Sequence, residues 1–394
     1  MDEQMEGYSL AVVEPNLRTA LRLAIVGCGQ GRTRYGAALT KLAGVQAAAL
    51  VDADLAKAKV WARDIGGRTP AYETIAALLA SEIQFDAVLV ATAIEGRAEQ
   101  TQAALLAGKP VLCEVPFAST LAEMDELLVI AAQSGGLLIP ALPRRLDPWF
   151  QAVTERVRNG LPGELRQIRC DWSFPIEGIT DSDDIVTGGW NALVQTLGCQ
   201  TADLCRLWQG NAKTVSADVN FADISGAGRG RRPLEGTLAN VIVAHDQGQS
   251  THHIGRSRSV LPDEKYTLTG ANGTLTLILS AGTGAVAAPS LRWQPNGSAA
   301  EKLMPRGEIS DAGLSAGVVR MRRLLLHFAD CVQTNAVPLL SAVDARAALE
   351  IVHAAYLSTQ ENSKVTLPLR RSPDIIGLLT AFRANPDLLF PGTG

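Results

Sequence analysis

The sequence predicts an α/β protein, with a Rossmann-type doubly wound parallel sheet followed by an α/β domain built on a large open antiparallel sheet. Three observations predict this fold. Short apolar runs alternate with helical patterns over residues 21–147, and a glycine-rich turn follows the first run. Longer alternating segments joined by hairpin signals follow residue 147. Strand–helix repeats of this length imply right-handed crossovers, and therefore a parallel sheet.

The expected parallel strands are short and nearly all apolar, as strands buried on both faces are. They are Leu23–Val26, Ala47–Val51, Ala87–Val90, Val111–Cys113 and Leu137–Ile139. Thr120 and Glu123 have the spacing of a capping box at a helix start, and Gly135-Gly136 ends that helix. These elements predict a dinucleotide-binding domain over residues 21–147.

The second half of the chain has longer strands with alternating polarity. They are Leu165–Phe174, Val215–Phe221, Leu238–His245, Ser250–Gly255, Lys265–Leu268 and Thr274–Leu279. Asp246-Gln247-Gly248 and Asn272-Gly273 are hairpin turn signals. Helical patterns return at Val319–Val332 and Ala342–Leu357. We therefore expect a substrate and oligomerisation domain over 148–370, an N-terminal extension over 1–20 and a C-terminal tail over 371–394.

Composition excludes several functional classes. The 394 residues carry a formal net charge of −4, so the chain lacks the basic balance expected for binding nucleic acid or an anionic membrane. No apolar run reaches the roughly 18 residues that a membrane span needs. The six cysteines have no CxxC spacing, and we expect neither a secretory leader nor a metal site. A cytoplasmic protein with reduced thiols is the simplest expectation.

A dinucleotide site is predicted where the first strand ends. Gly27-Cys28-Gly29-Gln30-Gly31 follows that strand and opens a helix, which lets the backbone approach a pyrophosphate. Asp52 ends the second strand, where a carboxylate binds the ribose 2′-OH and disfavours a 2′-phosphate. The expected cofactor is NAD(H), with NADP(H) as the alternative. Arg32 stands at the third fingerprint position, where it either disturbs helix packing or reaches a phosphate.

Several segments resemble the Gfo/Idh/MocA oxidoreductases, the family of glucose–fructose oxidoreductase and inositol dehydrogenase. They are LAIVGCGQG, VDADLAKA, FDAVLVATA, AALLAGKPVLCEVPF, LTGANGTLTL and SAVDARAALEIVHAAYLSTQENSKVTLPL. The resemblance spans residues 21–369. It implies a nicotinamide cofactor, a small substrate such as a sugar or polyol, and a homodimer or homotetramer formed through the open sheet.

The resemblance also assigns the cofactor-binding residues and implies a cis Val115–Pro116 bond. The expected cofactor contacts are Gly27, Gly29, Gln30, Gly31, Asp52, Ala91, Thr92, Glu114, Pro116 and Arg145.

The family's catalytic residues are replaced in this chain. Its Glu-Lys-Pro motif falls on Glu114-Val115-Pro116, so Val115 stands where the family has lysine. The family's aspartate and histidine on a later helix fall on Thr196 and Gln200, which share one helix face but do not titrate near neutral pH. A family histidine falls on Arg97.

Another group must then handle the proton, or the protein has lost turnover. The candidates are a strand histidine, with His253 preferred, Tyr35, or a water held by Thr196 and Gln200. Strand alternation places His252 and His253 on opposite faces. Arg97, Arg144 and Arg145 could together hold an anionic group on the substrate.

The sequence therefore favours an NAD(H)-dependent oxidoreductase-like protein with a non-standard acid/base centre. A catalytically degenerate nucleotide-binding accessory protein and a redox-neutral enzyme are the alternatives.

Overall fold

The computed structural model describes residues 19–175, 200–222, 235–257, 263–280, 289–305, 313–370 and 373. The chain divides into two compact units. The first comprises residues 1–117, 126–155 and 305–342, and the second comprises 118–125, 156–304 and 343–394. The segment 305–342, which the sequence places with the second domain, thus lies with the first.

The first unit is built on a six-stranded parallel sheet in the order β3-β2-β1-β4-β5-β6. Its strands are β1 (Leu21–Val26), β2 (Val45–Val51), β3 (Ala71–Tyr72), β4 (Ala87–Val90), β5 (Val111–Cys113) and β6 (Leu138–Pro140). Strand order reverses between β1 and β4, so the carboxyl ends of these two strands flank the crevice where doubly wound sheets bind ligands. The predicted Rossmann fold is confirmed.

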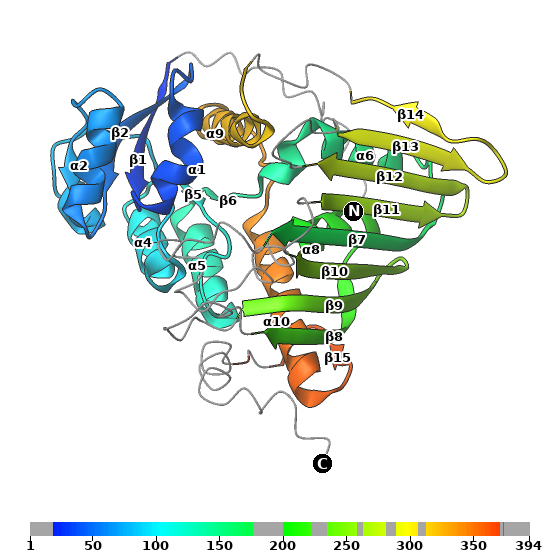
Figure 1. Cartoon of the computed structure of the whole chain (residues 1–394). Helices are drawn as coiled ribbons and strands as arrows, with labels where there is room; N and C mark the ends of the chain where they lie inside the picture. The colour runs from blue at the N-terminus through cyan, green and yellow to red at the C-terminus, as the bar shows by residue number, and fades with distance from the viewer. Residues whose placement is uncertain are drawn as a thin grey trace. The chain divides into compact units, whose positions relative to one another are not determined.

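Helices surround this sheet (Figure 1). They are α1 (Gln30–Leu39), α2 (Leu55–Asp64), α3 (Ile75–Leu79), α4 (Ile94–Leu106), α5 (Leu121–Ser134) and α9 (Ala316–Thr334). After β6 the chain continues into η1 (Pro143–Leu146) and α6 (Pro148–Arg158). The predicted capping box is present at α5, because Glu123 N donates to Thr120 Oγ1 and Thr120 N donates to Glu123 Oε2. All four residues of β4 are buried, as expected for a strand covered on both faces.

The second unit contains a sheet of nine described strands in the order β14-β13-β12-β11-β7-β10-β9-β8-β15. They are β7 (Leu165–Pro175), β8 (Ala212–Ala222), β9 (Glu235–His245), β10 (Gln249–Ser257), β11 (Asp263–Gly270), β12 (Gly273–Ser280), β13 (Ser290–Pro295), β14 (Glu301–Leu303) and β15 (Val365–Thr366). The hairpins predicted at 246–248 and 272–273 join β9 to β10 and β11 to β12. The sheet is mixed rather than wholly antiparallel, because β10 runs parallel to β7.

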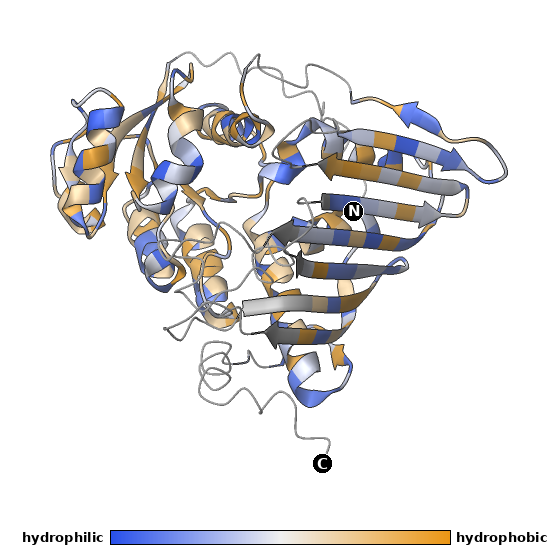
Figure 2. Cartoon of the chain, in the orientation of Figure 1, coloured by the Kyte–Doolittle hydropathy of each residue, from blue (hydrophilic) through white to orange (hydrophobic). Residues whose placement is uncertain are grey.

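One face of this sheet is covered by α8 (Ala202–Gln209) and α10 (Ala342–Glu361), which lie behind it in Figure 1. Hydropathy alternates along the strands in Figure 2, and in β12 Leu275, Leu277 and Leu279 are buried. Small side chains such as Ala348 and Ala355 line the buried side of α10. Among the described residues, no helix is both long and apolar enough to cross a membrane.

Candidate dinucleotide site

Gly27 permits a close approach between the ends of β1 and β4. Its φ is +99°, and a Cβ at this position would lie 2.5 Å from Ala91 O and 2.6 Å from Thr92 N. Real Cβ atoms do not come this close to backbone, so no other residue fits without moving the loop after β4. Gly31 is also close-packed, since its Cβ would lie 3.3 Å from the Ala91 Cβ. The predicted cofactor residues Gly27, Gly31, Ala91 and Thr92 therefore lie together.

Asp52 closes the glycine-rich turn from the end of β2. Its Oδ2 accepts a hydrogen bond of 2.7 Å from Cys28 N, and its Oδ1 accepts one of 2.9 Å from Asp54 N. Each carboxylate oxygen has a second lone pair, so ribose hydroxyls can still donate to Asp52. Burial, together with the Asp52 charge, raises the pKa of the Cys28 thiol to about 12, so this cysteine is not a reactive nucleophile.

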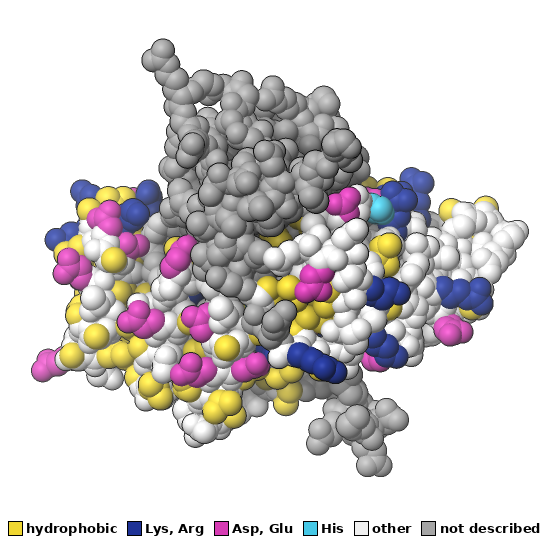
Figure 3. Space-filling view, turned by 90° about the horizontal axis from the view of Figure 1, so that it is seen from below, with side chains coloured by type: hydrophobic (Ala, Val, Ile, Leu, Met, Phe, Trp, Pro, Cys, Tyr) yellow, Lys and Arg dark blue, Asp and Glu magenta, His cyan; other side chains and the backbone are white. Residues whose placement is uncertain are grey.

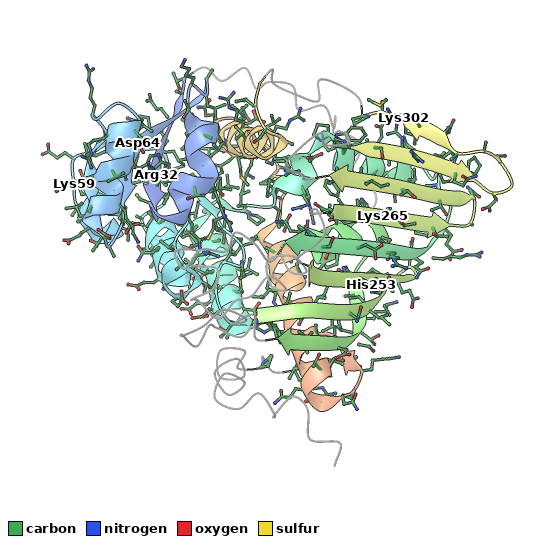
Figure 4. All side chains as sticks on the ribbon, in the orientation of Figure 1. Arg32, Lys59, Asp64, His253, Lys265 and Lys302 are labelled. Atoms are coloured by element: carbon green, nitrogen blue, oxygen red, sulfur yellow. The ribbon has the colours of Figure 1, made fainter. Side chains whose placement is uncertain are left out.

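Arg32 does not disturb the start of α1. It forms an exposed ion pair of 2.7 Å with Asp64 of α2, and Figure 4 labels both side chains on the two neighbouring helices. Beside them is a pocket of about 500 Å³, and Arg32 is part of its wall. The pocket is lined by Cys28, Gly29, Arg32, Thr33, Ala56, Lys57 and Val60.

The N-terminus of α1 opens at this turn without a side-chain cap. Gly29 is the N-cap, and no side chain accepts a hydrogen bond there. A helix N-terminus with free N–H groups stabilises an anion such as a pyrophosphate. The glycine turn, the uncapped helix and the pocket together fit a dinucleotide.

Glu114 is held in place by two residues of α1. Arg34 Nη1 donates to Glu114 Oε2 at 2.5 Å, and Tyr35 OH donates to Oε1 at 2.5 Å. The peptide bond between Val115 and Pro116 is cis, as the resemblance predicts. The sequence analysis did not identify Arg34 as a site residue. Its position beside Tyr35, on the helix that opens at the glycine-rich turn, could have indicated that it lies near the site.

Tyr35 is not a proton acceptor near neutral pH. Its ring is fully buried, and burial, followed by the Glu114 charge, raises its pKa well above the ordinary value. The phenol therefore stays protonated and serves as a donor to Glu114. This finding corrects the suggestion that Tyr35 could replace the family's base.

Arg97 joins the loops that follow β4 and β5. It is 6% exposed, and its guanidinium donates to Pro116 O at 2.7 Å and to Thr92 O at 2.6 Å. Three of its five N–H donors bind these two carbonyls, so the buried Arg97 side chain links the two loops. Arg145 Nη1 donates to Leu339 O at 3.2 Å, and the guanidinium of Arg144 lies 5.9 Å from the centre of the Phe150 ring.

The expected catalytic residues of the second unit are only partly described. Thr196 lies outside the described residues, and Gln200 lies two residues before the start of α8. His252 faces α8, because its Nδ1 lies 2.9 Å from Thr201 Oγ1. His253 is on the other face of β10, labelled in Figure 4, where its Nδ1 lies 2.8 Å from Asn240 Oδ1. The structure thus does not place His253 on the face that packs against the helix after Gln200.

Charge on the described part of one face is mixed. On the face shown in Figure 3, Lys and Arg side chains are interspersed with Asp and Glu. Among the described residues of that face, such a mixture creates no strong field of one sign.

The fold and the glycine cradle, which is the turn from Gly27 to Gly31 with Asp52 beside it, define a dinucleotide-binding protein of the Rossmann class. Residues 21–141 match the model of GFO_IDH_MocA, described as an oxidoreductase family with an NAD-binding Rossmann fold. Residues 21–141 are therefore an NAD-binding Rossmann domain of the Gfo/Idh/MocA type.

Curated relatives and solved structures are similar to the chain beyond this domain. The chain is 24% identical over 359 residues to D-apiose dehydrogenase from Paraburkholderia graminis, covering 87% of this chain and 89% of the relative. It is 29% identical over 215 residues to inositol 2-dehydrogenase 2 from Saccharopolyspora erythraea, covering 53% and 59%.

An oxidoreductase from Agrobacterium radiobacter, solved with NAD⁺, L-tartaric acid and magnesium, has the same fold. Its TM-score is 0.75 at 20% identity, over 88% of this chain and 98% of that one.

Proposed function

We propose that this protein is an NAD(H)-dependent oxidoreductase acting on a hydroxyl group of a sugar, polyol or related small molecule. The observation that carries the proposal is the close approach of Gly27 to the Ala91 carbonyl, which only glycine allows. The names of the relatives, an apiose dehydrogenase and an inositol dehydrogenase, support the substrate class.

The residues of the first unit would bind the cofactor as follows. Backbone N–H groups of Gly29, Gln30 and Gly31 would hold the pyrophosphate, and Asp52 would accept hydrogen bonds from the ribose. The loops after β4 and β5, with Thr92, Glu114 and Pro116, would line the nicotinamide half, with Arg145 nearby. Bound nicotinamide supplies the hydride acceptor for a carbinol carbon.

The hydroxyl proton requires a separate acceptor. Val115 is apolar and buried, so it cannot take part in the proton transfer that the family's lysine assists. We place this step at a water held by Thr196 and Gln200, because His253 lies on the sheet face away from α8. Losing a positioned acid/base group costs about 10²–10⁴ in rate, or roughly 3–5 kcal/mol. We therefore expect slow turnover.

A nucleotide-binding accessory protein without turnover is the second candidate. It is favoured because Val115, Tyr35 and His252 are buried and uncharged near neutral pH, so none of them accepts the hydroxyl proton. Besides Val115 and Tyr35, His252 is buried, and burial lowers its pKa to about 3. His252 therefore stays neutral at physiological pH and does not exchange protons there.

One kinetic experiment separates the two candidates. NADH formation is measured for the wild type on a panel of polyols, aldoses and hydroxy acids, at several pH values, with NAD⁺ and then NADP⁺. The oxidoreductase proposal expects slow turnover of at least one polyol or sugar, with NAD⁺ preferred. Cofactor binding without turnover of any panel member would favour the accessory protein.

We further propose that the protein is cytoplasmic and forms a homodimer or homotetramer through the open face of the second sheet. This face carries His253 beside Asn240, and an ion pair of 2.9 Å between Arg169 and Asp171. Light scattering of the purified chain tests the assembly. A monomer at micromolar concentration would contradict it.

A further inference from the structure

A buried cluster of soft ligands lies in the second unit, outside the dinucleotide cradle. Cys170 of β7, His252 of β10 and Cys205 of α8 each offer one ligand atom, and these atoms all lie within 4.8 Å of one another. The three residues are at most 2% exposed. Cys170 and His252 are register partners on adjacent strands, and Cys205 reaches them from the helix that covers this face. The fold thus brings together two thiols and an imidazole that are far apart in sequence.

The two sulfur atoms are spaced as zinc ligands are. Cys170 Sγ and Cys205 Sγ lie 3.6 Å apart. Two Zn–S bonds of about 2.3 Å at a tetrahedral angle place their sulfurs about 3.8 Å apart. Small side-chain movements are therefore enough for both sulfurs to bind one ion.

Hydrogen bonding fixes which nitrogen of His252 has a free lone pair. His245 Nδ1 lies 3.1 Å from Gly210 O, and since a carbonyl only accepts, Nδ1 carries the proton. The Nε2 atom of neutral His245 must then accept from Ser250 Oγ, at 2.8 Å. Ser250 Oγ can in turn accept from His252 Nε2–H, at 2.9 Å. The lone pair of His252 is therefore on Nδ1, which points toward α8 and accepts from Thr201 Oγ1.

This arrangement has the surroundings of a metal-binding histidine. Such a histidine donates its other ring N–H to an acceptor that fixes its tautomer, as Ser250 does for His252. Thr201, one helical turn before Cys205, presents a hydroxyl beside Nδ1 and is positioned as a fourth oxygen ligand or as a partner of a bound water. The chain from Gly210 O to His252 would hold the imidazole in place.

Binding a metal ion at this cluster requires the loss of the thiol protons. Burial, and then the neighbouring Cys205, raise the pKa of Cys170 well above its ordinary value, and the nearby Glu264 and Asp171 charges raise it further. Without a metal the Cys170 thiol therefore stays protonated. A coordinated divalent ion displaces the protons, and two thiolates neutralise its charge.

We propose that Cys170, Cys205 and His252 Nδ1 bind one Zn²⁺ ion, with Thr201 Oγ1 or a water completing the tetrahedron. Binding releases two thiol protons per ion. Thiolate and imidazole ligands select zinc over calcium or magnesium, which take oxygen ligands. With all three residues buried, the ion would be acquired during folding and would stabilise the second unit.

The test measures metal in the full-length wild type, purified without chelator or affinity-bound nickel. Elemental analysis should find about one zinc per chain. Protein refolded with Co²⁺ in place of zinc should show thiolate-to-cobalt charge-transfer absorption. Zinc content at background together with no charge-transfer band would overturn the proposal. So would an intact mass showing Cys170 and Cys205 joined by a disulfide, since no thiolates would remain to bind the ion.

Matched variants locate the ion. Cys205→Ala and His252→Gln should each lower zinc content at least about fivefold. The control is Cys331→Ala, which removes another buried thiol. The Sγ of Cys331 lies 3.7 Å from His327 Nε2, but among the described residues it belongs to no cluster of three possible metal ligands. It should keep full zinc content. Equal zinc in Cys205→Ala, His252→Gln and the wild type would overturn the assignment even if those variants are less stable.

Discussion

The backbone N–H of Cys28 donates a 2.7 Å hydrogen bond to Oδ2 of Asp52. The carboxylate that the fingerprint assigns to the ribose therefore also closes the glycine-rich turn. Under the proposed function, cofactor selectivity would depend on the same side chain as the geometry of this turn. A change at Asp52 should consequently affect both nucleotide affinity and stability.

We predict that Asp52→Asn weakens NADH binding by about tenfold or more and reduces the preference for NADH over NADPH. Asparagine replaces one carboxylate oxygen, which accepts hydrogen bonds from the turn and would accept them from the ribose, by an amide group that donates. The free energy of unfolding should fall by about 1–2 kcal/mol. Fluorescence titration with both nucleotides and urea unfolding measure these effects. Asp54→Asn is the control, since Asp54 only caps α2 through Ala56 N and asparagine caps helices equally well. Equal affinities for Asp52→Asn and the wild type would contradict the assignment.

Tyr35→Phe should destabilise the first unit. It removes the donor to Glu114 Oε1 and leaves a buried carboxylate oxygen without that bond, at a cost of about 1–3 kcal/mol. Denaturant unfolding measures the change. Tyr72→Phe, on the short strand β3, should change stability much less. A loss of nucleotide binding without any loss of stability would instead indicate that Tyr35 contacts the cofactor.

His353 should make stability depend on pH. Burial, and then the charge of Arg346, lower its pKa from 6.5 to about 4, so it remains neutral in the folded protein where an unfolded histidine takes up a proton. The unfolded state binds more protons in this range, so the free energy of unfolding should fall as pH drops from 6.5 to about 4. The contribution of His353 is fully present above pH 6.5.

The slope from one such histidine is at most about 1.4 kcal/mol per pH unit. Urea unfolding at a series of pH values should therefore show a shallower slope for His353→Gln than for the wild type. Tyr356→Phe, three residues along α10, is the control, since a phenol ionises far above this range. Parallel slopes for His353→Gln and the wild type would refute this account.

Restoring the family lysine alone should restore little activity. Val115→Lys provides an ammonium group, but positions 196 and 200 still hold threonine and glutamine. We expect kcat on the best substrate to change by less than about threefold, since one of several acid/base groups is returned. Val115→Met controls for side-chain size. A gain of 10² or more would show that the rest of the centre is competent.

Local sequence patterns predicted much of this fold. The capping box at Thr120, the hairpins at 246–248 and 272–273 and the opposite faces of His252 and His253 all follow from short-range periodicity, and the structure confirms them. The cis bond before Pro116 followed from the family resemblance. The positions of the glycine-rich turn at Gly27 and of Asp52 at the end of the second strand were likewise predicted from residue type and spacing.

The pairing of strands that lie far apart in the chain could not be predicted from the sequence. Nothing local in β10 indicates that it runs parallel to β7, because that register depends on where the chain returns after two intervening strands. The pairing brings His252 beside Cys170, and α8 adds Cys205, so the cluster has no sequence spacing that would predict it. Arg97 was a candidate for holding an anionic group of the substrate. In the structure it joins two loops through backbone carbonyls, which every residue carries and which no sequence pattern marks.

A calorimetric titration of NADH tests the central claim most directly, comparing the wild type, Gly27→Ala and Gly66→Ala. Both glycines have positive φ, but a Cβ at Gly27 meets the Ala91 carbonyl, whereas one at Gly66 has nothing within 4 Å. We predict binding with a dissociation constant in the micromolar range for the wild type and Gly66→Ala, and none detectable for Gly27→Ala. No heat of binding for the wild type at millimolar NADH, or unchanged affinity in Gly27→Ala, would contradict the account.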